Sequence, residues 1–144
     1  MKRTIILSIL LSVLLYGCNQ PKYSKYYSFD NQIWFQDSSI VFDFNSDNST
    51  KLNFEINLSY DNNYPFQNLY TTYSLIDSEK NVINSDMIEL QLFEKKYGYP
   101  LGSGVFNSFI IDSTFLKTQN ILKNEDYKLL LSLIHISEPT RRDQ

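Results

Sequence analysis

The segment from Lys51 to Tyr60 constrains the fold most, because apolar and polar side chains alternate through it without interruption. The apolar positions are Leu52, Phe54, Ile56, Leu58 and Tyr60, and the positions between them are Asn53, Glu55, Asn57 and Ser59. Successive side chains of a β-strand point to opposite faces, so this pattern predicts one face in a core and one face in water. No window of comparable length carries the apolar stripe of a helix.

Several other segments repeat the alternation. The further strands that we expect cover residues 39–45, 69–76 and 87–93, with weaker candidates at 105–112 and 126–131. Turn-rich pieces separate them. Short strands with one wet face have to cover the other face with a second sheet. We therefore expect an all-β fold, an antiparallel β-sandwich of the immunoglobulin or jelly-roll type, over residues 29–130.

The chain begins as secretory signal peptides do. A basic pair, Lys2 and Arg3, precedes an apolar run at residues 5–16 that is too short to span a bilayer. The Leu-Tyr-Gly-Cys that follows resembles a bacterial lipobox, in which residues 1–17 are cleaved and Cys18 is lipidated. Acyl chains such as palmitate would anchor the protein, since each buried methylene contributes about 0.8 kcal/mol. The alternative is an ordinary signal peptide with an incidental cysteine.

Charge and composition argue against several classes of function. Between Cys18 and Leu130, nine lysines stand against fourteen acidic residues, a net charge of −5 with no basic stretch. We therefore expect no nucleic-acid partner. The same region has no histidine and a single cysteine, so neither a histidine-activated nucleophile nor a zinc site is expected. The sequence predicts no catalytic residues, no metal and no cofactor, although it cannot test for paired carboxylates.

One acidic stretch partly matches the pattern of a calcium-binding loop. Asp43, Asn45 and Asp47 match the first three ligand positions of an EF-hand loop. However, Asn48 replaces the glycine that the sharp turn needs, and Phe54 replaces the bidentate glutamate. The stretch also joins two strand patterns, so we interpret it as a hairpin loop.

Aromatic residues are abundant, with 11 tyrosines and 10 phenylalanines. Exposed aromatic side chains bind sugars or anchor protein interfaces, whereas buried ones fill sandwich cores and cross-strand pairs. We expect the core role for most of them, with Trp34 as an anchor of the core near the first strand.

Four stretches together resemble a known family. They are "IWFQDSSIVFDF" at 33–44, "NNYPFQNLY" at 62–70, "YGYPLGSGVFNS" at 97–108 and "NEDYKLLL" at 124–131. With the lipobox, they resemble the GldH family of gliding-motility lipoproteins of the Bacteroidota. The chain departs from the family pattern at Ser59, where an arginine is common, and it lacks the family's closing Met-Arg segment and glycine-bearing strand.

The resemblance implies where the protein makes contacts. The candidate interaction turn comprises Asn63, Tyr64, Pro65, Phe66, Asn68 and Leu69, and the candidate interaction loop comprises Gly98, Leu101, Gly102 and Gly104. The alternative is that these residues only shape turns. Asp112-Ser113-Thr114 fits the short O-glycan acceptor pattern of that phylum, with Ser113 as the acceptor.

The resemblance also implies location and role. Residues 18–28 are expected to be a polar tether without the acidic run that marks surface export in that phylum. The implied protein is a non-enzymatic outer-membrane lipoprotein facing the periplasm, an accessory of gliding motility and type IX secretion. Its partners would be other proteins of that assembly. The alternative is a carbohydrate-binding sandwich of a glycan-uptake system.

The C-terminal segment carries a resemblance of another kind. Residues 131–141 read "LSLIHISEPTR", which resembles the translation of a transposon-end adapter used in DNA sequencing; the alternative is a genuine tail. We therefore expect residues 131–144, with the only histidine, His135, to be a non-native tail. The sandwich would then lack its last one or two strands and be less stable than the intact product.

Overall fold

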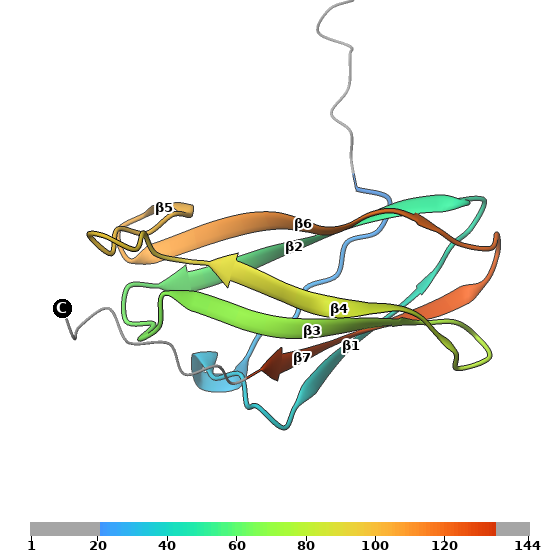
Figure 1. Cartoon of the computed structure of the whole chain (residues 1–144), viewed down its shortest axis with the longest axis horizontal. Helices are drawn as coiled ribbons and strands as arrows, with labels where there is room; N and C mark the ends of the chain where they lie inside the picture. Colours follow the sequence, from blue (N-terminus) through green and yellow to red (C-terminus); the bar gives the residue numbers. More distant parts are fainter. Residues whose placement is uncertain (1–20, 135–144) are drawn as a thin grey trace, which may run out of the picture.

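The computed structural model describes residues 21–134, which form two antiparallel β-sheets packed face to face (Figure 1). The strands are β1 (Ser39–Asn45), β2 (Lys51–Asp61), β3 (Asn68–Ile76), β4 (Val82–Gln91), β5 (Ser103–Val105), β6 (Ser108–Asn120) and β7 (Asp126–Ile134). One 3-10 turn, η1 (Asp30–Gln32), precedes them. The predicted all-β sandwich is confirmed. Within this range, no helix has the length and apolar character needed to cross a membrane.

The sheets have four and three strands, in the orders β1-β7-β3-β4 and β2-β6-β5. The last strand, β7, therefore lies inside its sheet, paired with β1 from Ser39–Ser132 to Asn45–Asp126 and with β3 from Tyr70–Ile134 to Ile76–Lys128. In the other sheet, β5 covers only the first residues of β6.

The alternation read from the sequence places the core. On β3, Leu69, Tyr73 and Leu75 are buried on the inner face, and on β2 the predicted apolar set is the more buried one. Aromatic rings join the two sheets: the Phe44 ring on β1 lies 5.7 Å from that of Tyr127 on β7 and 5.6 Å from that of Phe54 on β2. Most aromatic residues in the described part of the sandwich strands thus fill the core, as expected.

The structure differs from these expectations in four places. The strand expected at residues 87–93 begins and ends earlier, as β4, Val82–Gln91. Residues 105–112 are not one strand, because a tight turn at Phe106, with φ 56°, separates β5 from β6. β6 then continues to Asn120, since Ser108–Asn120 pairs along the whole of β2 despite a bulge. Trp34 is half-buried rather than a central core residue, and its ring stacks 5.0 Å from Phe29 at the margin of the core.

Residues at both expected boundaries of the domain contact the sandwich beyond the limits that the sequence predicted. β7 continues past Leu130 to Ile134, and Leu131, in the expected tail, is only 4% exposed. At the other end, residues 22–25 of the expected tether bond to β1 and the turn after it. The signal peptide, Cys18 and residues 135–144 lie outside the described residues.

Candidate interaction surface

The candidate turn and the candidate loop, about thirty residues apart in sequence, are joined by hydrogen bonds at one end of the sandwich. The carbonyl of Gln67, in the turn between β2 and β3, accepts from the Leu92 amide at 2.8 Å and the Phe93 amide at 3.1 Å. Both donors begin the connection between β4 and β5. The Leu92 carbonyl in turn accepts from the Leu101 amide of the candidate loop at 2.9 Å, so the turn and the loop form one structural unit.

The hydroxyl of Tyr60 fixes the far side of the same connection. It donates to the Leu92 carbonyl at 2.7 Å and accepts from the Gly102 amide at 2.9 Å. Its ring packs edge-on against Phe93, with 5.4 Å between centroids, and Phe93 is fully buried. A buried hydroxyl with both its donor and acceptor roles filled holds the connection firmly on the end of β2.

The predicted turn divides into surface and buried residues. The Asp61 carboxylate caps it by accepting from the Asn63 amide at 2.7 Å, and Asn63 and Pro65 are exposed. The Tyr64 ring is half-buried, 5.8 Å from the Phe66 ring, and burial raises the pKa of Tyr64 to about 12. Asn68 and Leu69, by contrast, belong to β3 and are 5% and 7% exposed, so they support the turn from inside the sandwich and are not part of its surface.

The predicted loop is held from inside by Glu94. Its carboxylate accepts from the Lys96 amide at 2.9 Å and the Tyr97 amide at 2.5 Å, and its carbonyl accepts from the Gly98 amide. Gly98 has φ 66°, a conformation that glycine adopts without strain. This turn directs Tyr97 and Tyr99 outward, 63% and 67% exposed, with ring centroids 6.0 Å apart.

The hairpin between β5 and β6 completes this end. A Cβ on Gly104 would lie 2.0 Å from the Ser108 carbonyl oxygen, so only glycine lets the two strands approach as they do. The hairpin carries Phe106 at its tip, 96% exposed, beside Val105 at 72%. Leu101 is about half-exposed, and its amide bonds the Leu92 carbonyl at 2.9 Å.

We call residues 62–67 and 92–107 the aromatic end. Its most exposed aromatic residues, Tyr97, Tyr99 and Phe106, were not among those predicted from the sequence, where the glycines of the same stretch were chosen instead. The Tyr-Gly-Tyr-Pro at residues 97–100 and the Phe-Asn at 106–107 were available signals, because turns with glycine, proline and asparagine expose their neighbours.

The other predicted positions lie elsewhere. Ser113 is half-buried in the middle of β6, opposite Ile56 of β2, and its glycosylation remains a prediction. The lipidation site, Cys18, is outside the described residues. Within residues 21–134, no three histidine, cysteine or acidic side chains gather as metal ligands would.

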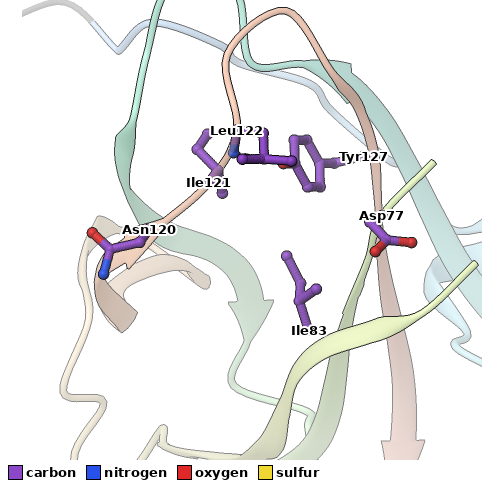
Figure 2. Close-up of a pocket in the computed structure, with 6 residues that line it drawn as sticks. All are labelled: Asp77, Ile83, Asn120, Ile121, Leu122 and Tyr127. Atoms are coloured by element: carbon purple, nitrogen blue, oxygen red, sulfur yellow. The ribbon is translucent and has the colours of Figure 1, made fainter. Parts of the chain in front are cut away.

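The opposite end of the sandwich contains a small cleft. It has a volume of about 240 Å³ and lies between the β3–β4 turn and the connection from β6 to β7 (Figure 2). Ile83, Ile121, Leu122 and Tyr127 supply its apolar lining, and Asp77 and Asn120 lie at its margin. Hydrogen bonds from Asn81 hold the pKa of the Asp77 carboxyl below its usual range. The cleft has one charged side chain, so no acid–base pair is present in it.

Fold and surface together define a class: an antiparallel β-sandwich whose conspicuous exposed groups are aromatic side chains at one end. The family model of the GldH lipoprotein matches residues 22–135, and the chain belongs to this family. It is 28% identical over 135 residues to the gliding motility lipoprotein GldH of Flavobacterium johnsoniae, covering 92% of this chain and 79% of that protein. No solved structure matches. Family membership supports membrane attachment through lipid.

Proposed function

We propose that the protein is an accessory lipoprotein of the gliding-motility and type IX secretion machinery, anchored in the outer membrane and facing the periplasm. It acts without catalysis, by binding another protein of that assembly through the aromatic end. Membership of the GldH lipoprotein family and the name of the Flavobacterium relative support the association with motility. The absence of an acidic run after Cys18 supports the periplasmic orientation.

The observation that carries the binding role is the set of exposed aromatic rings on firmly bonded loops. Tyr97, Tyr99 and Phe106 are 63%, 67% and 96% exposed, although large apolar side chains are usually buried. Aromatic residues dominate the binding energy of protein interfaces. Because Glu94 and Tyr60 already fix the backbone, little conformational entropy is lost on binding.

A carbohydrate ligand is the second candidate, because exposed tyrosines also stack on sugars. Sugar platforms present rings in one plane, whereas the Tyr97 and Tyr99 rings are inclined by 42°. Phe44, Tyr60 and Tyr127 lie buried among the sheets rather than along an open face. These features favour a protein partner. Binding of purified protein to a glycan array, lost in Tyr97→Ala, would favour the sugar instead.

The test replaces the chromosomal gene with the Phe106→Ala variant and measures colony spreading and secretion. Loss of an interface anchor costs about 2 kcal/mol, roughly 30-fold in affinity, so we expect spreading to be reduced with the protein at its normal level. The matched control is Phe35→Ala, the same change at a phenylalanine that is 65% exposed and lies outside the aromatic end. Normal spreading in both Phe106→Ala and a Tyr97→Ala/Tyr99→Ala double variant would contradict the proposed surface.

A further inference from the structure

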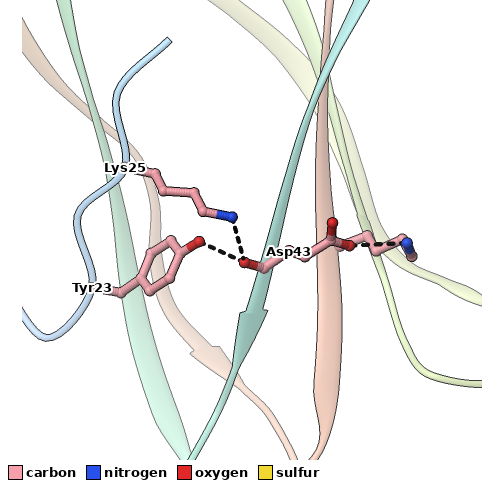
Figure 3. Close-up of polar contacts among 4 residues, drawn as sticks. Tyr23, Lys25 and Asp43 are labelled. Carbon is pink, nitrogen blue, oxygen red and sulfur yellow. Dashed lines mark hydrogen bonds and ion pairs between the residues drawn. The ribbon is translucent and has the colours of Figure 1, made fainter.

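Residues 22–29 do not extend freely from the sandwich but lie against its β1 side, and we call them the strap. The Tyr23 hydroxyl donates to the Asp43 carbonyl at 2.5 Å, and the Lys25 ammonium donates to the same oxygen at 3.4 Å (Figure 3). The Tyr23 ring also packs 5.7 Å from the core ring of Phe44. Asp43 is held in turn by Lys128 of β7, whose ammonium lies 2.9 Å from its carboxylate.

The strap leads to a defined end of the sandwich. The Lys22 ammonium donates to the hydroxyl of Ser49, in the turn between β1 and β2. That turn is bonded to the connection between β6 and β7, because the Thr50 carbonyl accepts from the Ile121 amide at 3.0 Å. We call this end, residues 46–50, 77–81 and 121–125, the anchor end. β2 runs from it to the aromatic end.

Chain length then fixes which end lies near the lipid. Three residues separate Cys18 from Lys22, so the four Cα–Cα steps between them span about 14 Å even in a fully extended chain. The eleven residues of β2 span about 35 Å in the other direction. The distance allowed to the anchor end is therefore much shorter than the distance from there to the aromatic end.

An apolar side chain is exposed near the anchor end. Leu122 is 71% exposed at the mouth of the apolar cleft, beside Ile83 at 38%. Exposed apolar tips of this kind enter the boundary between headgroups and acyl chains. The anchor end itself carries Lys80 and Lys123 against four carboxylates, those of Asp47, Asp77, Glu79 and Glu125. Charge therefore does not draw this end to anionic phospholipid, and the covalent lipid and the strap would hold it at the surface.

We infer that the anchor end rests on the phospholipid surface, with Leu122 at the headgroup level, and that the strap holds the aromatic end away from the membrane. This inference rests on the proposed lipidation of Cys18. The protein is then not a domain on a loose tether, because the strap removes most of the tether's length. The bilayer itself is the partner of the anchor end, and the aromatic end stays open to proteins of the periplasm.

The test uses the lipidated full-length protein in vesicles of phosphatidylethanolamine and phosphatidylglycerol that contain a headgroup-region spin-label quencher. Acylation consumes Cys18, the only cysteine, so an introduced cysteine is the single free thiol to which a fluorophore attaches. Lys123→Cys and Lys95→Cys are a matched pair, the same change at an exposed lysine of each end. We expect quenching at position 123 to exceed that at 95 at least threefold.

Equal quenching at the two positions, or stronger quenching at 95, would overturn the inference. A second variant tests the strap. Tyr23→Ala removes the bond to the Asp43 carbonyl and the contact with the Phe44 ring, and it should bring the two quenching values together while leaving the melting temperature near that of the parent. If Tyr23→Ala keeps the difference, the strap does not orient the domain. These readings need no motility, so their failure is distinct from that of the proposed function.

Discussion

The two ends of the sandwich are closed by the same device, a buried hydroxyl that both donates and accepts across a loop. At the aromatic end, Tyr60 donates to the Leu92 carbonyl at 2.7 Å and accepts from the Gly102 amide at 2.9 Å. At the anchor end, Ser46 donates to the Leu122 carbonyl at 2.7 Å and accepts from the Glu125 amide at 3.0 Å. Both ends therefore satisfy buried backbone groups from within the fold.

What differs is the set of side chains that each closed loop exposes. The aromatic end presents Tyr97, Tyr99 and Phe106, whereas the anchor end presents Leu122 and short polar turns. Because the hydroxyls hold the loops from inside, the exposed side chains are not needed for the fold. Exposed aromatic residues on loops already held from within are therefore better explained by binding than by stability.

Substitutions of Phe93 and Phe106 test whether buried or exposed aromatic rings stabilise the aromatic end, and Phe93→Ala should give the largest change of all the variants. Phe93 is fully buried, so Phe93→Ala should lower the free energy of unfolding by about 3–5 kcal/mol. Phe106→Ala, at a side chain 96% exposed, should change it by less than about 0.5 kcal/mol. Urea denaturation measures both. Similar losses in the two variants would show that the exposed ring is part of the fold.

Removal of each hydroxyl in turn tests whether Tyr60 and Ser46 stabilise their two ends independently. Tyr60→Phe removes the partner of the Gly102 amide, while the Leu92 carbonyl keeps its bond from the Leu101 amide. Ser46→Ala removes the hydroxyl partner of both the Leu122 carbonyl and the Glu125 amide. Each substitution should cost about 1–3 kcal/mol. Amide hydrogen exchange gives the sharper reading. Tyr60→Phe should accelerate exchange at Gly102 and leave Glu125 unchanged, and Ser46→Ala should do the reverse. Faster exchange at both amides in either variant would mean that the ends are not independent.

Sequence patterning predicted the scaffold well because alternation is a local property. Residues 39–45 are β1 as expected, 51–60 lack only Asp61 of β2, and 69–76 lack only Asn68 of β3. The same locality accounts for β7. Leu131 and Leu133 continue the inward phase of Tyr127 and Leu129, so the strand extends into the segment that resembles a translated adapter. The origin of that segment remains a prediction, which resequencing of the gene tests.

The sites were harder to predict because their bonds join residues distant in sequence. Tyr60 reaches Leu92 across 32 residues and Gly102 across 42, and no local pattern announces either bond. The sequence did place the turn and the loop that these bonds connect. The sequence predicted a polar tether where the structure has the strap. Lysines and tyrosines are equally typical of a solvent-exposed segment, and only the fold brings the Asp43 carbonyl beside Tyr23 and Lys25.

A small loss of stability at alkaline pH should come from Tyr64, at the base of the aromatic end. Burial raises the pKa of Tyr64 from its ordinary value of 10.0 to about 12. A group whose pKa is raised on folding contributes stability that is complete below the unfolded pKa and is lost as pH rises through the folded pKa. The contribution from Tyr64 should therefore be present at pH 9 and fall between about pH 10 and 12.

Comparison with Tyr64→Phe isolates this contribution, since the other tyrosines titrate in both proteins. The urea midpoint of the parent should fall further than that of Tyr64→Phe between pH 9 and pH 11, and an ultraviolet titration should show one tyrosine fewer with a raised pKa in the variant. The hydroxyl of Tyr64 has only a long contact, 3.5 Å to the Asn68 carbonyl, so the substitution itself should cost little at neutral pH. If the two midpoints fall in parallel, the Tyr64 ring is open to water, and the base of the aromatic end is looser than its hydrogen bonds indicate.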